Sequence, residues 1–111
     1  METTLVHKDA RGEIHRILIT PEREIMLFHC LAGYLRGGHS HDVDEVVFIL
    51  AGKVRYHKMV NGKKKMEMLA EGDFVYNRAG EPHMGEFLED SWVLDWKVGP
   101  QGQIGQWKTT D

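Results

Sequence analysis

The chain has 111 residues, 41% of them hydrophobic, and a formal net charge of −3. This length supports one hydrophobic core and excludes two full domains. The negative charge, without a basic stripe interleaved with aromatic residues, argues against nucleic acid as a partner.

The sequence also lacks the signs of a membrane or secreted protein. No segment approaches the roughly 18 consecutive apolar residues of a membrane span, and the first residues contain no apolar signal region. Cys30 is the one cysteine, so no internal disulfide can form, which is typical of a reducing compartment. We therefore expect a cytoplasmic protein with neither a membrane nor nucleic acid as a partner.

Short apolar runs alternate with turn residues along most of the chain. Residues 1–12 are polar and mixed in charge, which predicts a loosely held lead-in, and residues 99–111 read as a polar tail. The domain is therefore expected at 13–98. Strands are expected at 13–19, 25–34, 39–50, 53–60, 63–69, 74–76, 83–88 and 91–98.

The pair Asn61-Gly62 lies between two of these runs. Asn-Gly between strand-like segments is the strongest short-range signal for a β-hairpin. Eight short strands with frequent turns, and no amphipathic helix, predict an all-β sandwich or barrel.

Three residues with metal-binding side chains lie close together in the sequence, within residues 39–45. His39, His41 and Glu45 are spaced i, i+2 and i+6. Side chains alternate between the two faces of a strand, so an extended strand would project all three to one side. Two imidazoles and a carboxylate on one face form a plausible site for a divalent ion.

This stretch resembles the first conserved motif of cupins, a superfamily that includes the RmlC-like proteins. The resemblance rests on His39-x-His41-x-x-x-Glu45, followed by six residues and Gly52. A second stretch resembles the second cupin motif. It consists of Gly72, five intervening residues, and then Arg78-x-Gly80-x-x-His83. The two motifs span about 38–83, under half of the chain. The resemblance implies a double-stranded β-helix, also called a jelly roll or cupin barrel.

Carried over residue by residue, the resemblance implies one divalent transition metal per chain, bound by His39, His41, Glu45 and His83. Neutral imidazoles with one carboxylate suit Fe, Mn, Ni or Zn. Two residues differ from the second cupin motif. Arg78 stands where proline is usual, and Phe87 stands where asparagine is frequent. Phe87 would make one wall of the pocket apolar.

The resemblance leaves the function open, because cupin folds host many chemistries. The first hypothesis is a metal-dependent enzyme, such as a dioxygenase, isomerase or lyase, that acts on a small organic acid or sugar derivative. The second is a non-catalytic module that binds a small molecule or carbohydrate, or acts as a sensor, with a structural metal. The Arg36-Gly37-Gly38-His39 stretch also resembles cupin epimerases and isomerases of nucleotide sugars.

An isomerase of that kind needs an acid–base pair. The candidates for such catalytic groups are His29, Tyr34, Tyr76 and Glu81. Each of them is more often a structural residue. Because apolar residues stand on both faces of the expected strands, we also expect a homodimer.

Overall fold

The computed structural model describes residues 2–20 and 23–99, and ten strands but no helix occur among them. No described helix could therefore cross a membrane. The strands are β1 (Glu2–Asp9), β2 (Gly12–Thr20), β3 (Arg23–Cys30), β4 (Leu35–His39), β5 (Glu45–Ala51), β6 (Lys53–Val60), β7 (Lys63–Ala70), β8 (Phe74–Asn77), β9 (His83–Phe87) and β10 (Ser91–Lys97).

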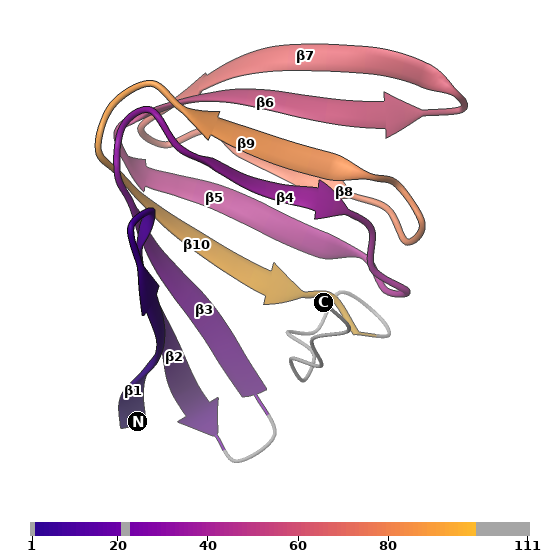
Figure 1. The fold of residues 1–111 in the computed structure, drawn as a ribbon. Coiled ribbons are helices and arrows are strands. Elements are labelled where there is room, and N and C mark those ends of the chain that lie inside the picture. The colour runs from indigo at the N-terminus through magenta and orange to yellow at the C-terminus, as the bar shows by residue number, and fades with distance from the viewer. Residues whose placement is uncertain (1, 21–22, 100–111) are drawn as a thin grey trace.

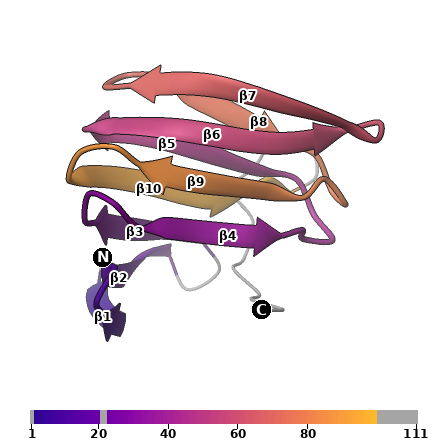
Figure 2. The same ribbon diagram turned by 45° about the horizontal axis from the view of Figure 1, so that its top comes forward.

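The strands form two antiparallel sheets that face each other (Figure 1). The larger sheet has six strands in the order β1-β2-β3-β10-β5-β8, and the smaller has four in the order β4-β9-β6-β7. Figure 2 shows the two sheets as separate layers, with β1 and β2 extending beyond the smaller sheet. The expected all-β jelly roll is confirmed.

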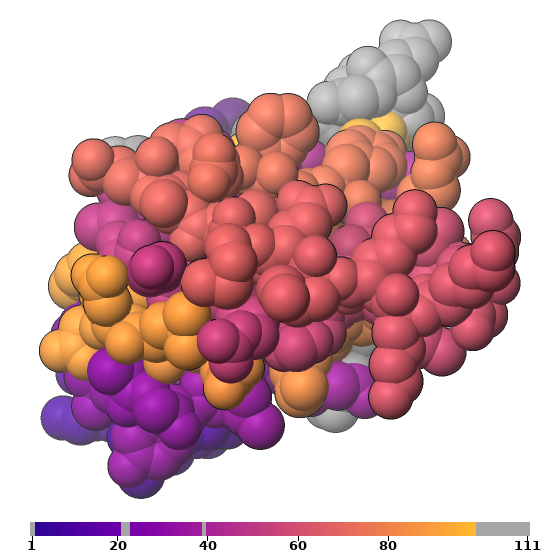
Figure 3. All heavy atoms as spheres, turned by 90° about the horizontal axis from the view of Figure 1, so that it is seen from above, coloured from indigo at the N-terminus to yellow at the C-terminus, as the bar shows by residue number. Residues whose placement is uncertain are grey.

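The core lies between the two sheets, because the inward side chains of their central strands are apolar. In β5 the odd positions Val47 and Ile49 are buried, and in β10 Val93 is buried between them and β3. Val54 and Phe87 meet them from the smaller sheet. Seen from above, β4, β9, β6 and β7 follow one another across the outside of the smaller sheet (Figure 3).

The hairpin expected at Asn61-Gly62 is present between β6 and β7. Asn61 has a φ of 51° and Gly62 a φ of 75°. Two consecutive positive φ angles are what a two-residue type I′ hairpin turn requires, and Asn-Gly adopts them at low cost. The register follows from this turn, since Val60 pairs directly with Lys63.

Residues 2–9 differ from the loosely held lead-in that their polarity predicts. They form β1, which pairs with β2 along its length and has almost entirely exposed side chains. A strand at the edge of a sheet needs few apolar side chains, so its sequence carries no clear pattern. The polar tail expected at 99–111 lies, apart from Gly99, outside the described residues.

Candidate metal centre

The candidate ligands come from both sheets rather than from one strand. β4 ends at His39 in the smaller sheet, β5 begins at Glu45 in the larger, and His41 lies in the loop between them. The prediction of a single strand over 39–50 is therefore wrong. The side chains converge because a loop crosses from one sheet to the other, and strand alternation is not the cause.

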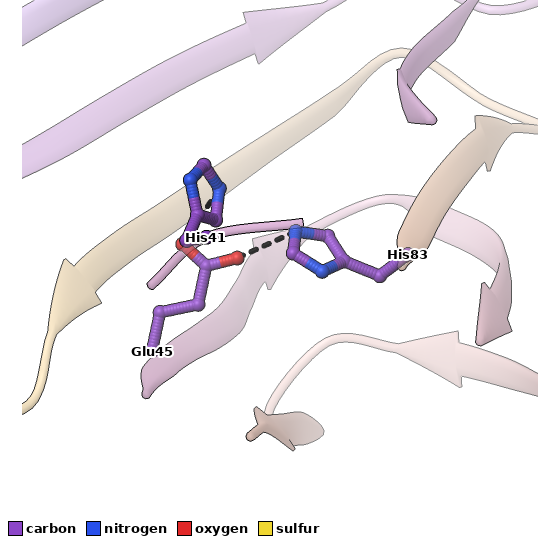
Figure 4. A group of neighbouring side chains, drawn as sticks. All are labelled: His41, Glu45 and His83. Carbon is purple, nitrogen blue, oxygen red and sulfur yellow. Dashed lines mark ion pairs between the residues drawn. The ribbon is translucent and has the colours of Figure 1, made fainter. Parts of the chain in front are cut away.

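Three of the four predicted ligands lie together in the core (Figure 4). The ligand atoms of His41, Glu45 and His83 all lie within 4.8 Å of one another. Glu45 Oε1 is 2.6 Å from His83 Nε2, and Glu45 Oε2 is 3.5 Å from His41 Nε2. The carboxylate thus presents one oxygen to each imidazole.

Glu45 is fully buried, which makes its charge costly unless it is compensated. Burial acts to raise the pKa of Glu45, but the hydrogen bond from His83 and the charges of both imidazoles outweigh it, so the pKa is lowered. Asn77 Nδ2 donates a longer hydrogen bond of 3.3 Å to Glu45 Oε1, the oxygen that faces His83. The cluster therefore keeps a carboxylate ionised inside the core.

The ring of His83 is oriented by the backbone. Its Nδ1 lies 3.1 Å from the carbonyl oxygen of Glu81, which can only accept a hydrogen bond. Nδ1 therefore carries a proton, and Nε2 is the nitrogen that faces Glu45. A backbone carbonyl in this role is the usual way in which a protein orients a metal-binding histidine.

The residues present fit a divalent metal. On an octahedral ion with bonds of about 2.1 Å, neighbouring ligand atoms lie about 3 Å apart, close to the spacings of 2.6 and 3.5 Å found here. Glu45 Oε2 is buried and accepts no hydrogen bond. A buried carboxylate oxygen of this kind is available to a cation.

His39, the fourth predicted ligand, is placed only through its backbone. Its Cα pairs with that of His83 across β4 and β9. Whether the imidazole of His39 completes the site remains a prediction.

The cluster borders a cavity of about 650 Å³ between the sheets. This volume is within the range of small-molecule sites. His41, His83 and Asp95 line it together with a mostly apolar wall that includes Phe87, as expected from the sequence. The same cavity is also lined by three arginines, Arg11, Arg16 and Arg36.

None of the four candidate acid–base residues lines this cavity in the described part of the chain. His29 stacks on Trp92, with ring centroids 4.2 Å apart, and Tyr34 is exposed. Tyr76 and Glu81 line a separate cavity of about 230 Å³. The structure therefore does not bring these residues together with the three candidate ligands, although Glu81 contacts His83 through its carbonyl group.

The sequence reasoning missed two polar residues beside the candidate ligands. Tyr56 is buried and its hydroxyl accepts a hydrogen bond of 2.6 Å from Asn77. Burial raises the pKa of Tyr56 far above its usual range, so the phenol stays neutral. Tyr56 in β6 and Asn77 in β8 could have been assigned to the core from the sequence only by following how side chains alternate between the two faces of each strand.

The comparisons with known proteins support the fold. Neither a protein-family model nor a curated protein matches the sequence. Among solved structures, KdgF from Halomonas sp. is 20% identical, with a TM-score of 0.69, over 82% of this chain and 81% of that chain. The match therefore covers most of both chains.

Two larger proteins match over a part of their length. Oxalate decarboxylase from Bacillus subtilis, described with Mn(II) centres, is 21% identical with a TM-score of 0.75, over 95% of this chain and 30% of that chain. The capsular polysaccharide assembling protein CapF from Staphylococcus aureus is 20% identical with a TM-score of 0.74, over 97% of this chain and 35% of that chain. All three are cupin-fold proteins, and this chain has the cupin fold.

Proposed function

We propose that this chain binds one divalent transition metal through His41, Glu45 and His83, with His39 as a fourth ligand, and binds a small molecule in the adjoining cavity. The observation that carries the proposal is a buried carboxylate that presents one oxygen to each of two imidazoles. The cluster borders a cavity of about 650 Å³. The site therefore combines a donor set suited to Fe, Mn, Ni or Zn with space for a ligand.

Within this proposal, the chain is a metal-dependent enzyme that acts on a small organic acid or sugar derivative. A bound divalent ion supplies Lewis acidity toward the oxygens of a ligand. The chain contributes the rest: Glu45 offsets part of the ion's charge, the Glu81 carbonyl orients His83, and Phe87 and its apolar neighbours exclude water. An oxalate decarboxylase with Mn(II) centres has the same fold, which supports the proposal by analogy only.

A non-catalytic binding module is the second candidate, and the placement of the acid–base candidates favours it. His29 and Tyr34 lie outside the cavity, as do Tyr76 and Glu81. Tyr56, which does line it, is held neutral by burial. A nucleotide-sugar isomerase requires an acid–base pair at its substrate. The isomerase alternative therefore has the least support of the three.

The test is elemental analysis of protein purified without added metal, followed by titration of the metal-free protein with Mn(II) and Zn(II). We expect about one ion per chain in the wild type. Variants His41→Ala and His83→Ala should weaken metal affinity about tenfold or more, because each removes one ligand. His39→Ala should do the same, because the proposal makes His39 the fourth ligand.

The matched control is His57→Ala. His57 also lies in the smaller sheet, but its side chain is 40% exposed and contacts Glu86 on the outer face. This variant should keep full metal content. Equal metal content in the wild type and His83→Ala would contradict the proposed site.

A further inference from the structure

Arg36 is a buried arginine that faces the cavity. Its side chain is 10% exposed and lines the same cavity as His41 and His83. In the register of β4 and β9, Arg36 pairs with Gly85, which is two residues from His83. Two residues along a strand span about 7 Å, so the backbone of Arg36 lies near His83, and both residues line the cavity.

Two nitrogens of this guanidinium make no hydrogen bond. Nε and Nη2 of Arg36 are both buried and without a hydrogen-bond partner. These two N–H groups point along one edge of the planar guanidinium, the edge that pairs with the two oxygens of a carboxylate. Buried N–H groups that donate no hydrogen bond are costly, and a ligand carboxylate at this edge would offset that cost.

Asp9 forms an ion pair with Arg36, but it does not fill this edge. Its Oδ1 lies 3.5 Å from Arg36 Nη2, too far for a good hydrogen bond. Asp9 already accepts three hydrogen bonds from Arg11 and one from His7, at 2.6 to 3.0 Å. Since two arginines share one aspartate here, this end of the cavity keeps a positive charge.

The guanidinium is also held in place from one side. Its central carbon lies 5.8 Å from the centre of the Phe28 ring, within the range of a cation–π contact. Gly85, the cross-strand neighbour of Arg36, lines the same cavity and packs against Val54 and Phe87. The free edge is therefore presented to a ligand by rigid elements of both sheets.

We propose that Arg36 binds the carboxylate of a small organic acid whose other oxygens face His41, Glu45 and His83. This inference rests on the proposed function, since it assigns the substrate class of the same cavity. Arg36 would then decide specificity: an acid is held at both ends, whereas a neutral molecule of the same length leaves the guanidinium unpaired.

The experiment measures binding by calorimetry with two probes of equal length, gluconate and sorbitol, which differ in one carboxylate. We expect the metal-loaded wild type to bind gluconate at least tenfold more tightly than sorbitol. Arg36→Gln should lose this preference, and Arg36→Lys should restore only part of it, because lysine keeps the charge but not the planar edge. Inorganic phosphate should compete poorly with gluconate.

The control is Arg55→Gln. Arg55 lies in β6 of the same sheet, but its side chain is 40% exposed and pairs with Glu86 at 3.0 Å on the outer face. The Arg55→Gln variant loses the same charge as Arg36→Gln but leaves the cavity lining unchanged. It should therefore bind gluconate as the wild type does. Equal binding of gluconate and sorbitol, or unchanged binding in Arg36→Gln, would overturn the inference.

A second readout separates ligand binding from a structural role. If Arg36 served only to pair with Asp9, Arg36→Met would lower the melting temperature of the ligand-free protein. We expect the melting temperature to stay the same or rise, because a buried guanidinium whose Nε and Nη2 donate no hydrogen bond is replaced by an apolar side chain of similar length. A clear fall would contradict the inference.

The two proposals can fail separately. Gluconate binding to the metal-free protein, measured beside the loaded protein, should retain its dependence on Arg36. If the chain binds no metal but this dependence remains, the metal proposal fails and the role of Arg36 stands. If metal binds and Arg36→Gln has no effect, the reverse holds.

Discussion

Glu45 decides the electrostatics of the site at the scale of single residues. It is fully buried, and its ionised form depends on the imidazoles of His41 and His83. Its lowered pKa means that the charged form stabilises the folded state above the ordinary carboxyl pKa of 4.5. This stabilisation is lost as the pH falls through the lowered folded-state value.

The first prediction follows from this sign. The melting temperature of the metal-free wild type should fall more steeply between pH 6 and pH 3 than that of Glu45→Gln, because glutamine does not titrate. Scanning fluorimetry across this range measures both slopes. Glu67→Gln, at an exposed position of β7, is the control and should keep the wild-type slope. Identical slopes for wild type and Glu45→Gln would contradict the account.

Cys30 gives the second prediction at this scale. The residue is 1% exposed, and burial raises the pKa of its thiol from 9.0 to about 11. At pH 8 the thiolate fraction is therefore about a hundredfold lower than for an ordinary thiol. Ellman's reagent should react at least a hundredfold more slowly with the native protein than with the protein unfolded in urea. Rapid native reaction would show that Cys30 is accessible.

At the scale of elements, the contact between β4 and β9 positions the site. Gly37 has a φ of 105°, and a Cβ at this position would lie 2.7 Å from the carbonyl oxygen of His83. Gly38 follows with a φ of 88°, but a Cβ there would meet nothing within 4 Å. The two glycines thus share the unusual backbone angle and differ in the close approach.

Their pairing allows a third prediction. Gly38→Ala should destabilise the protein by about 1 kcal/mol through backbone strain alone. Gly37→Ala should cost about 2 kcal/mol more, because the backbone at His83 must also move. It should weaken metal binding as well. Urea denaturation of both variants gives the difference, and equal losses would exclude a tight β4–β9 contact.

The elements also show how far the sequence could predict this fold. The β6–β7 hairpin follows from Asn61-Gly62, since few other dipeptides accept two positive φ angles. β1 was missed because an exposed edge strand shows no apolar pattern. The interpretation of residues 39–50 as one strand was wrong because alternation describes faces within a strand but not where the strand ends.

The site shows the same division. His41, Glu45 and His83 could be found from the sequence because metal-ligand residue types at motif spacing are rare by chance. Arg36 could not be recognised as a cavity residue. Its burial results from contacts with Asp9 and Phe28 on strands of the other sheet, and these depend on how the two sheets pack.

At the scale of the whole molecule, the outer face of the six-stranded sheet carries a row of apolar side chains. Phe48, Leu94 and Leu27 lie side by side across β5, β10 and β3 on the face opposite the core. Leu50 and Phe74, 39% and 63% exposed, extend this apolar face at its margin. The expected homodimer, which stays a prediction, would bury this face against a second copy.

The fourth prediction concerns this surface. Light scattering should give twice the 12.8 kDa of one chain for the wild type at micromolar concentration. The double variant Leu50→Glu, Phe74→Glu should give a monomer, because burying carboxylates in an apolar interface is costly. Met66→Glu, at a 54% exposed position of the other sheet, should remain dimeric. A monomeric wild type would contradict the dimer.

The central claim is that a divalent metal occupies the cluster of His41, Glu45 and His83. Crystals soaked in Mn(II) and measured near the manganese absorption edge test it most directly. We expect one strong anomalous peak within about 2.3 Å of Glu45 and of Nε2 of His83, and the map will also place the imidazole of His39. An empty cluster, with Glu45 and His83 still in direct contact at saturating Mn(II), would contradict the claim.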